Sequence, residues 1–169
     1  MSKLVAHNHP ALHTIAEEVT EVEFTDGSVE KWIKDLRKAL LSYNVEGFVP
    51  VAIAAPQIGL SKRMFLIDDQ SSGKDRDRVP SLVAINPQIK RFSKKSHLVE
   101  EGCLSVPELY GAVRRSTNVT MTALDETGKF YERGAGGLLA QIFQHEVDHL
   151  DGTLFNERAD EVWKIKTDK

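Results

Sequence analysis

The first long alternation of hydrophobic and polar positions lies in residues 28–43. Its hydrophobic residues recur at intervals of three and four, which places them on one face of a helix, while the lysines and Asp35 fall off that face. A second such pattern follows Gly136 and Gly137 and runs to Leu150, just before Gly152. The pattern therefore predicts two helices, each with one face packed against the rest of the protein.

Short apolar runs separated by Gly, Pro, Asn and Asp lie between the two predicted helices, which is typical of strands joined by turns. These runs are 51–54, 64–67, 82–85, 98–101 and 119–124, and residues 125–128 then resemble a hairpin turn before 129–131. Strands without intervening helices favour antiparallel or mixed sheets. We therefore expect one α+β domain over residues 1–169, with its sheets packed around the second helix.

Two segments carry less information. The polar run 70–78 is typical of an exposed loop. The tail from Asn156 onward is charged but includes Val162, Trp163 and Ile165, so it is predicted only to dock loosely or to form a short helix.

Composition limits the classes of partner and compartment. The 169 residues are 41% hydrophobic and 28% charged, with a net charge of -3, which gives no strong attraction to nucleic acid or to an anionic membrane. The sequence shows neither a signal peptide at its start nor an apolar run long enough to cross a bilayer. We expect a cytoplasmic monomer with no membrane and no specific nucleic-acid partner.

The strongest chemical signal is the sequence HEVDH at residues 145–149, a match to H-E-x-x-H. Residues four apart on a helix share a face, so His145 and His149 can reach one metal ion, and Glu146 is placed to act as general base. The alternative is a pair of polar histidines on an exposed face. Against it, Leu138 and Ile142 lie on the same line as both histidines, which directs the imidazoles toward the core.

A catalytic metal normally takes three protein ligands and leaves one position open. Residues after His149 include carboxylates but neither histidine nor cysteine, so an upstream ligand is favoured. Cys103 is the one cysteine of the chain, and a thiolate binds divalent metals tightly. A lone cysteine is more often a small buried hydrophobe. The neighbouring Gly102, which permits close backbone approach to a ligand, favours the metal role here.

Three motifs in order make the sequence similar to the peptide deformylase family. EGCLS stands at residues 101–105 and QHEVDH at residues 144–149. The family's G-x-G-x-A-A-P-Q appears as PVAIAAPQ at residues 50–57, so Pro50 and Ala52 replace its two glycines. The resemblance is good from about residue 51 to residue 155.

The resemblance implies an α+β enzyme that removes the formyl group from the N-terminal methionine of new polypeptides at the ribosome. It assigns metal binding to Cys103, His145 and His149, with Glu146 as the general base. Oxyanion binding falls to the Gln57 amide and the Leu104 backbone N–H. Glu101 and Arg115 are expected to form an ion pair. The family's metal is Fe²⁺, and the same donors suit Zn²⁺, Ni²⁺ or Co²⁺. Ferrous iron beside Cys103 would make the enzyme sensitive to oxygen.

The methionine side chain needs an apolar pocket beside the metal. Residues adjacent to the motifs are candidates, although each is equally typical of an ordinary core position: Val51, Ala52, Val99, Leu138 and Ile142. The methyl group of Ala52 and the missing N–H of Pro50 are expected to alter rate or substrate range while leaving the fold and metal site intact.

Two other functions stay open. One is a metal-dependent hydrolase of a different small amide, and the other is a deformylase-like metal-binding protein that has lost catalysis. Glu146 and Gln57 argue against the second, because neither is needed to hold a metal.

Overall fold

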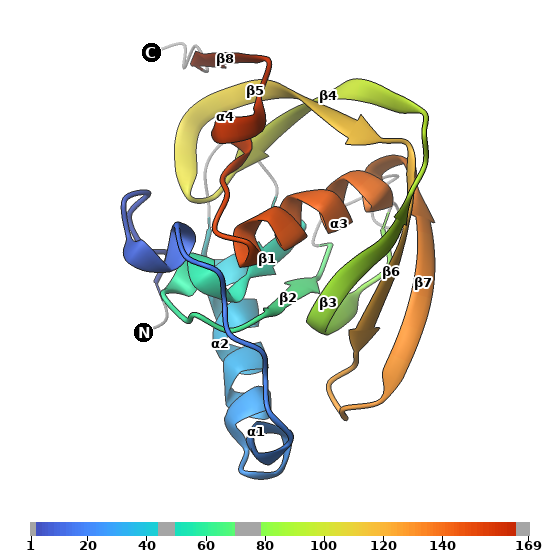
Figure 1. Cartoon of the computed structure of the whole chain (residues 1–169). Coiled ribbons are helices and arrows are strands. Elements are labelled where there is room, and N and C mark those ends of the chain that lie inside the picture. The colour runs from blue at the N-terminus through green and yellow to red at the C-terminus, as the bar shows by residue number, and fades with distance from the viewer. Residues whose placement is uncertain (1–2, 44–49, 70–78, 165–169) are drawn as a thin grey trace.

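The computed structural model of the chain describes residues 3–43, 50–69 and 79–164 (Figure 1). The helices are α1 (Glu21–Thr25), α2 (Ser28–Ser42), α3 (Gly137–Leu150) and α4 (Phe155–Arg158), with 3-10 helices η1 (Pro10–Leu12) and η2 (Ala55–Ile58). The strands are β1 (Ala52–Ala54), β2 (Met64–Ile67), β3 (Leu82–Phe92), β4 (Ser96–Cys103), β5 (Val106–Ser116), β6 (Asn118–Leu124), β7 (Phe130–Gly136) and β8 (Glu161–Lys164). Within these ranges no helix has both the length and the apolar composition needed to span a membrane.

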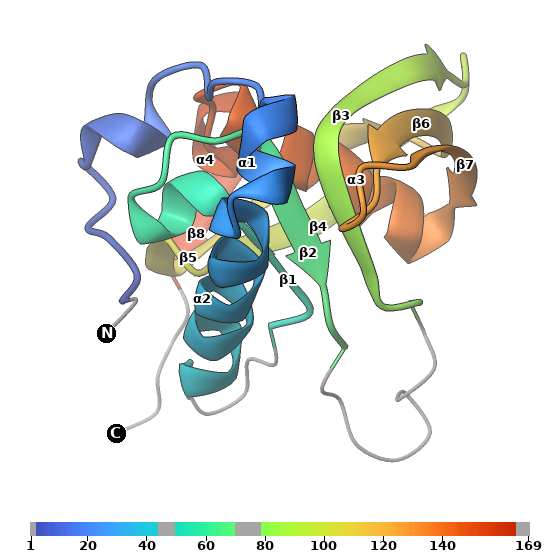
Figure 2. The same cartoon turned by 90° about the horizontal axis from the view of Figure 1, so that it is seen from below.

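A five-stranded antiparallel sheet in the order β1-β2-β3-β6-β7 packs against α2 on one face and α3 on the other. Strand β2 shows why its sequence is apolar throughout. Successive side chains point to opposite faces, so Met64 and Leu66 pack with α2 while Phe65 and Ile67 pack with α3. Figure 2 shows α2 running alongside β1 and β2.

A three-stranded antiparallel sheet in the order β4-β5-β8 lies on the other side of α3. In Figure 1 the β4–β5 hairpin arches over α3, away from β1 and β2. A smaller buried cluster under this hairpin joins Leu12, Cys103, Val106, Val113, Leu154 and Phe155. Helix α3 is therefore held between the two sheets, which places its side chains close to the end of β4.

The N-terminal segment closes over the end of α3. Gly152 has a φ of +72°, and a Cβ built on it would lie 2.8 Å from the backbone nitrogen of Thr14. The backbone N–H of Ala16 also donates to the carbonyl of Leu150 at 2.8 Å. Because only glycine tolerates both the backbone angle and the contact, Gly152 fixes how the chain leaves α3.

The α+β class and the antiparallel sheets predicted from the sequence are confirmed, as are the helices at residues 28–42 and 137–150. The predicted strands are all present, and β3 and β4 are longer than predicted. Strand β5 was not predicted at all. The tail forms the short helix α4, which was one of two alternatives, and also the unpredicted strand β8. The predicted loop at 70–78 lies outside the described residues.

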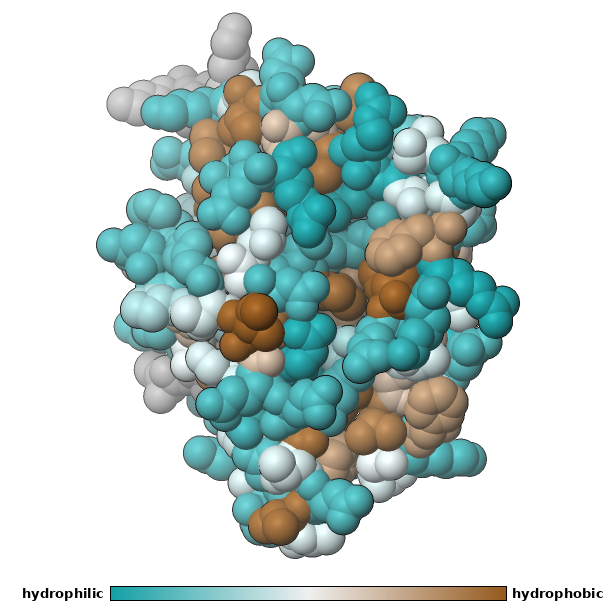
Figure 3. Space-filling view, viewed as in Figure 1, coloured by the Kyte–Doolittle hydropathy of each residue, from teal (hydrophilic) through white to brown (hydrophobic). Residues whose placement is uncertain are grey.

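The surface offers little guidance to function. On the face of the described residues shown in Figure 3, hydrophobic residues form small separate groups within a mostly hydrophilic surface, as is usual for globular proteins. Buried polar side chains are more informative, because each must be paired to offset the cost of leaving water. They are Gln57, Glu101, Ser105, Arg115, Thr122, Gln144, Glu146, Asp148 and His149.

Candidate metal centre

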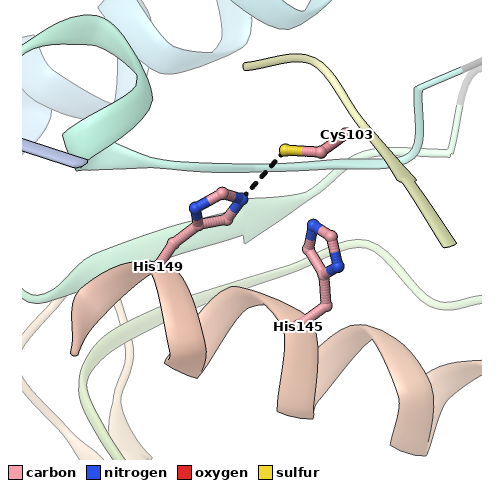
Figure 4. Close-up of side chains that lie close together, drawn as sticks. All are labelled: Cys103, His145 and His149. Atoms are coloured by element: carbon pink, nitrogen blue, oxygen red, sulfur yellow. Dashed lines mark hydrogen bonds between the residues drawn. The ribbon is translucent and has the colours of Figure 1, made fainter. Parts of the chain in front are cut away.

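Three buried or half-buried side chains converge where β4 ends beside α3. Cys103 is the last residue of β4, and His145 and His149 lie one turn apart on α3 (Figure 4). The Sγ atom of Cys103 lies 3.1 Å from Nε2 of His149, and one ligand atom from each of the three residues lies within 4.8 Å of the others. The thiol predicted to be the third ligand is therefore next to both imidazoles.

The backbone around Gly102 directs the cysteine toward α3. The pairing of β4 with β5 shifts register between Gly102 and Cys103, a bulge of the kind that re-aims a side chain at the end of a strand. Gly102 packs against the ring of Tyr110, and a Cβ there would lie 3.1 Å from the ring's Cζ atom. A side chain at position 102 would therefore require the Tyr110 ring to move aside.

The charges around Cys103 favour the ligand form of its sulfur. Burial by itself raises the pKa of the thiol, but the imidazoles of His149 and His145 more than offset this and hold the pKa well below its usual range. A thiolate with two imidazoles is a donor set that suits zinc, iron, nickel or cobalt. The closeness of the donor atoms fits one divalent ion bound by all three residues.

Glu101 fixes the orientation of His145. Its Oε2 atom lies 2.8 Å from Nδ1 of His145, which leaves Nε2 of that ring for a metal. Arg115 holds the same carboxylate with two hydrogen bonds, from Nε at 2.8 Å and from Nη2 at 2.9 Å. Burial raises the pKa of Glu101, but Arg115 and His145 together lower it to about 2. The structure thus places Glu101 and Arg115 in the two-point ion pair that the resemblance implies.

Asp148 belongs to the same network, although the sequence analysis gave it no role. Its Oδ2 atom accepts a hydrogen bond from Nη1 of Arg115 at 2.6 Å. The available signal was helical spacing, because Asp148 follows His145 by three residues within the motif QHEVDH. A buried carboxylate on the same side of the helix as a ligand predicts a cation beside it.

Glu146 is buried in the wall of the cavity that opens beside the three ligands. It is 5% exposed, and its Oε2 atom has no hydrogen-bond partner among the described residues. Burial raises the pKa of this carboxyl, while His145 and His149 lower it less. A carboxyl with a raised pKa and a free oxygen is suited to taking up and returning a proton.

The cavity has a volume of about 170 Å³. It is lined by Pro50, Val51, Ala52, Gln57, Glu100, Glu101, Gly102, Cys103, Leu104, Leu138, Gln141, Ile142, His145 and Glu146. Four of the five residues predicted to hold the substrate are among them. The fifth, Val99, pairs with Val113 in the β4–β5 hairpin and does not line the cavity.

Gln57 is held rigidly at the other side of the thiol. Its Oε1 atom accepts from the backbone N–H of Ala54 at 2.8 Å, and its Nε2 atom lies 3.1 Å from Oγ of Ser105 and 3.4 Å from Sγ of Cys103. Ser105 was another residue that the sequence analysis did not single out. These bonds direct the amide N–H groups of Gln57 toward the metal ligands, and Leu104 lines the cavity beside it.

Comparison with known proteins agrees with this geometry. A family model described as polypeptide deformylase matches residues 1–164. The chain belongs to the polypeptide deformylase family. Peptide deformylase 2 of Gloeobacter violaceus is 38% identical over 155 residues, covering 89% of this chain and 79% of the relative. The peptide deformylase of Treponema pallidum (strain Nichols) is 38% identical over 152 residues, covering 90% of this chain and 84% of the relative.

Solved deformylase structures share the fold. A peptide deformylase from Legionella pneumophila superimposes with a TM-score of 0.80 at 36% identity, covering 95% of this chain and 86% of that one. A class I type b deformylase from Acinetobacter baumannii, solved with Met-Ala-Ser bound, gives a TM-score of 0.80 at 34% identity and covers 92% and 96% of the two chains. The predicted family is confirmed, and these likenesses support an enzyme with deformylase function.

Proposed function

We propose that this deformylase removes the formyl group from the N-terminal methionine of new polypeptides and releases formate. The observation that carries the proposal is the convergence of Cys103, His145 and His149 beside the buried carboxylate of Glu146, in a cavity with apolar walls. Three ligands with a free general base are what amide hydrolysis at a metal requires.

The metal ligands are Cys103, His145 and His149, and we propose Fe²⁺ as the ion in the cell, with Zn²⁺, Ni²⁺ or Co²⁺ able to replace it. When bound, such an ion lowers the pKa of a water molecule and polarises a carbonyl oxygen. Loss of activity in air is expected for the iron form, because a thiolate at position 103 can be oxidised irreversibly. Activity that survives air but follows added zinc would point to zinc instead.

Glu146 acts as the proton carrier of the reaction. It takes a proton from water as the water oxygen attacks the formyl carbon, and it returns the proton to the methionine nitrogen as the C–N bond breaks. The products are formate and a free amine. The unpartnered Oε2 atom and the raised pKa of Glu146 support both halves of this role.

Gln57 and Leu104 stabilise the negative charge that develops on the formyl oxygen. The Gln57 amide is held in place by Ala54 and Ser105, and the backbone N–H of Leu104 is the second donor that we propose. The Gln57 N–H that faces Cys103 would turn to the formyl oxygen, and loss of one such donor costs a factor of about a hundred to a thousand in rate.

The methionine side chain occupies the apolar part of the cavity. Val51, Ala52, Leu138 and Ile142 line that cavity and support this assignment, whereas Val99, predicted for the same pocket, is not in the lining. The Acinetobacter baumannii relative has been solved with Met-Ala-Ser bound, which makes formyl-Met-Ala-Ser a suitable test substrate.

We further propose that residues 1–169 act as one catalytic domain and as a monomer, on chains emerging from the ribosome in the cytoplasm. All the proposed ligands come from a single chain, and the family match spans residues 1–164. Gel filtration of the metal-loaded protein tests the oligomeric state. Cosedimentation with translating ribosomes tests the place of action.

Formate release from formyl-Met-Ala-Ser by protein purified without oxygen tests the function. We expect turnover by the wild-type protein and a fall of about 10²–10⁴ in rate for Glu146→Ala, with metal content unchanged. Preferential hydrolysis of another small amide would favour the metal amidase. Full metal content with no turnover of any amide would indicate a protein that has lost catalysis.

Ala52→Gly tests the unusual first motif. Ala52 lines the cavity, so removing its methyl group should change the rate or the range of formyl-Met peptides accepted, with metal content unchanged. Measuring turnover for several peptides checks this, and an identical profile would show that the alanine has no effect on the reaction.

A further inference from the structure

We infer that Arg158, on the short helix α4, is a positioning residue for the metal centre. It pairs with Asp148 and completes a chain of charges that runs from the surface of α4 to the ring of His145. The inference rests on the proposed metal role of His145. No ligand or substrate contact is assigned to Arg158 itself.

Asp148 receives two guanidinium groups on one oxygen. Its Oδ2 atom lies 2.6 Å from Nη1 of Arg115 and 3.0 Å from Nε of Arg158. The Asp148 side chain is 11% exposed, that of Arg115 is 5% exposed, and that of Arg158 is 50% exposed. Arg158 is therefore the residue through which this row of paired charges reaches solvent.

Among the arginines and carboxylates of this network, the charges balance only when Arg158 is counted, and His145 also faces Glu101. Glu101 and Asp148 supply two negative charges, and Arg115 and Arg158 supply two positive ones. Without Arg158, Arg115 would be the one guanidinium shared by the two buried carboxylates, and Asp148 would lose half of its pairing. Buried charges without full compensation are costly, so Arg115 would be drawn toward Asp148 and away from Glu101.

The position of Arg115 matters because Arg115 holds the carboxylate that holds His145. The Oε2 atom of Glu101 accepts from Nη2 of Arg115 and lies 2.8 Å from Nδ1 of His145. A carboxylate behind a ligating histidine fixes its ring and its tautomer, and loss of such a partner typically weakens metal binding 10- to 100-fold. Arg158 is separated from Glu101 by Asp148 and Arg115, so the effect of replacing it is expected to be smaller.

Arg114 provides a matched comparison, because it is also a half-exposed arginine held in an ion pair. It pairs with Asp160 at 3.7 Å, with both side chains more than half exposed, and so ties the segment after α4 to β5 without touching the charge chain. Exposed pairs of this kind contribute little. Replacing Arg114 therefore removes an arginine and its ion pair near α4 while leaving Asp148 fully paired.

The test is the rate at which cobalt, loaded into the full chain, is lost to excess chelator. We expect Arg158→Gln to lose cobalt roughly 3- to 10-fold faster than wild type, below the 10- to 100-fold typical of a direct partner. Arg158→Lys should restore part of the difference, since it keeps the charge but loses the planar group. Arg114→Gln should match the wild type.

Two further readouts separate positioning from a purely structural role. Raising the ionic strength screens the half-exposed Arg158 pair, so it should speed cobalt loss more in wild type than in Arg158→Gln. The visible spectrum of bound cobalt should also change in Arg158→Gln. Equal cobalt loss in wild type and Arg158→Gln would overturn the inference, as would equal acceleration by Arg158→Gln and Arg114→Gln.

These outcomes do not depend on catalysis. If the protein released no formate but Arg158→Gln still lost cobalt faster, the positioning role would stand and the proposed function would fail. Normal formate release with unchanged cobalt loss would support the proposed function and overturn the positioning role of Arg158. If Arg158→Gln folded poorly, Arg158→Lys would carry the test, and a loss rate and cobalt spectrum identical to wild type would then overturn the inference.

Discussion

Two packing regions of the molecule differ in the polarity of their buried side chains. Between α2 and the five-stranded sheet the buried side chains are apolar, with Leu36 of α2 and Leu66 of β2 both 0% exposed. Between α3 and the β4–β5 hairpin the buried side chains include the ions Glu101, Arg115 and Asp148. The hydrophobic effect holds the first region together. The second region contains charged side chains in positions that apolar side chains could occupy.

This difference separates residues that stabilise the fold from residues that position the candidate metal site. Burying apolar surface stabilises a fold by roughly 25 cal/mol per Å². A buried ion pair is often no more stabilising than apolar residues of the same volume, so its presence is weak evidence for stability. We infer that the apolar clusters on the two faces of the five-stranded sheet, against α2 and α3, are the main source of hydrophobic stabilisation, and that the charges beside α3 serve to orient the proposed metal ligands.

The largest effect should come from the apolar side. Leu36→Ala removes a fully buried side chain and should lower the free energy of unfolding by about 3–5 kcal/mol, measured by denaturant titration. The metal content and turnover of the folded protein should not change. Leu41→Ala on the same helix is the control, because Leu41 is 56% exposed and its loss should cost no more than about 0.5 kcal/mol. A parallel loss of metal in Leu36→Ala would show that the two regions are not separate.

Removal of the metal should have the next largest effect. An ion that binds only the folded protein at 100 to 1,000 times its Kd stabilises it by about 3–4 kcal/mol, which a chelator should abolish. Amide exchange should accelerate first in β4 and the second half of α3, where the three ligands lie. Leu36→Ala should lower the stability of the loaded and stripped proteins equally, since distant sites add. Equal loss of protection in α2 and α3 on stripping would argue against the comparison.

A smaller effect is expected at Tyr131 on β7, whose hydroxyl donates to the carbonyl of Val83 at 2.8 Å. Tyr131→Phe should cost about 1 kcal/mol at neutral pH without changing metal content. Burial raises the pKa of Tyr131 to about 12, so the neutral phenol is favoured in the folded protein. Its contribution is complete below the ordinary value near 10 and declines as pH rises toward 12.

The pH dependence gives a direct check on this assignment. The stability difference between wild type and Tyr131→Phe, measured by urea titration, should shrink between about pH 10 and pH 12. A difference that stayed constant over that range would mean that the phenol does not titrate with the expected shift.

The parts of the fold that followed simple periodicity were predictable. Helices α2 and α3 and strand β2 bury regular sets of apolar residues, and the sequence located all three. Strand β5 breaks the rule because its pattern includes Pro107, a left-handed Glu108 and the buried Arg115. Arg115 is buried only because Glu101 and Asp148 surround it, and that pairing depends on residues far away in the chain.

The same distinction applies to the site. Motif spacing singled out His145 and His149, and the chemistry of the lone cysteine, with the family resemblance, singled out Cys103. The structure brings the three together. Ser105 and Asp148 were missed because their partners come from other elements, Gln57 on η2 and Arg115 on β5. A residue whose role is to hold another residue has no pattern of its own in the sequence.

The contact between Gly152 and the backbone of residues 13–14 also affects when the protein can fold during its synthesis. The backbone of His13 and Thr14 packs against Gly152, so this segment can settle only after residue 152 has been synthesised. Two of the three proposed metal ligands, His145 and His149, lie shortly before Gly152. A chain that has not yet reached residue 152 therefore has neither a settled 13–14 segment nor a finished candidate metal site.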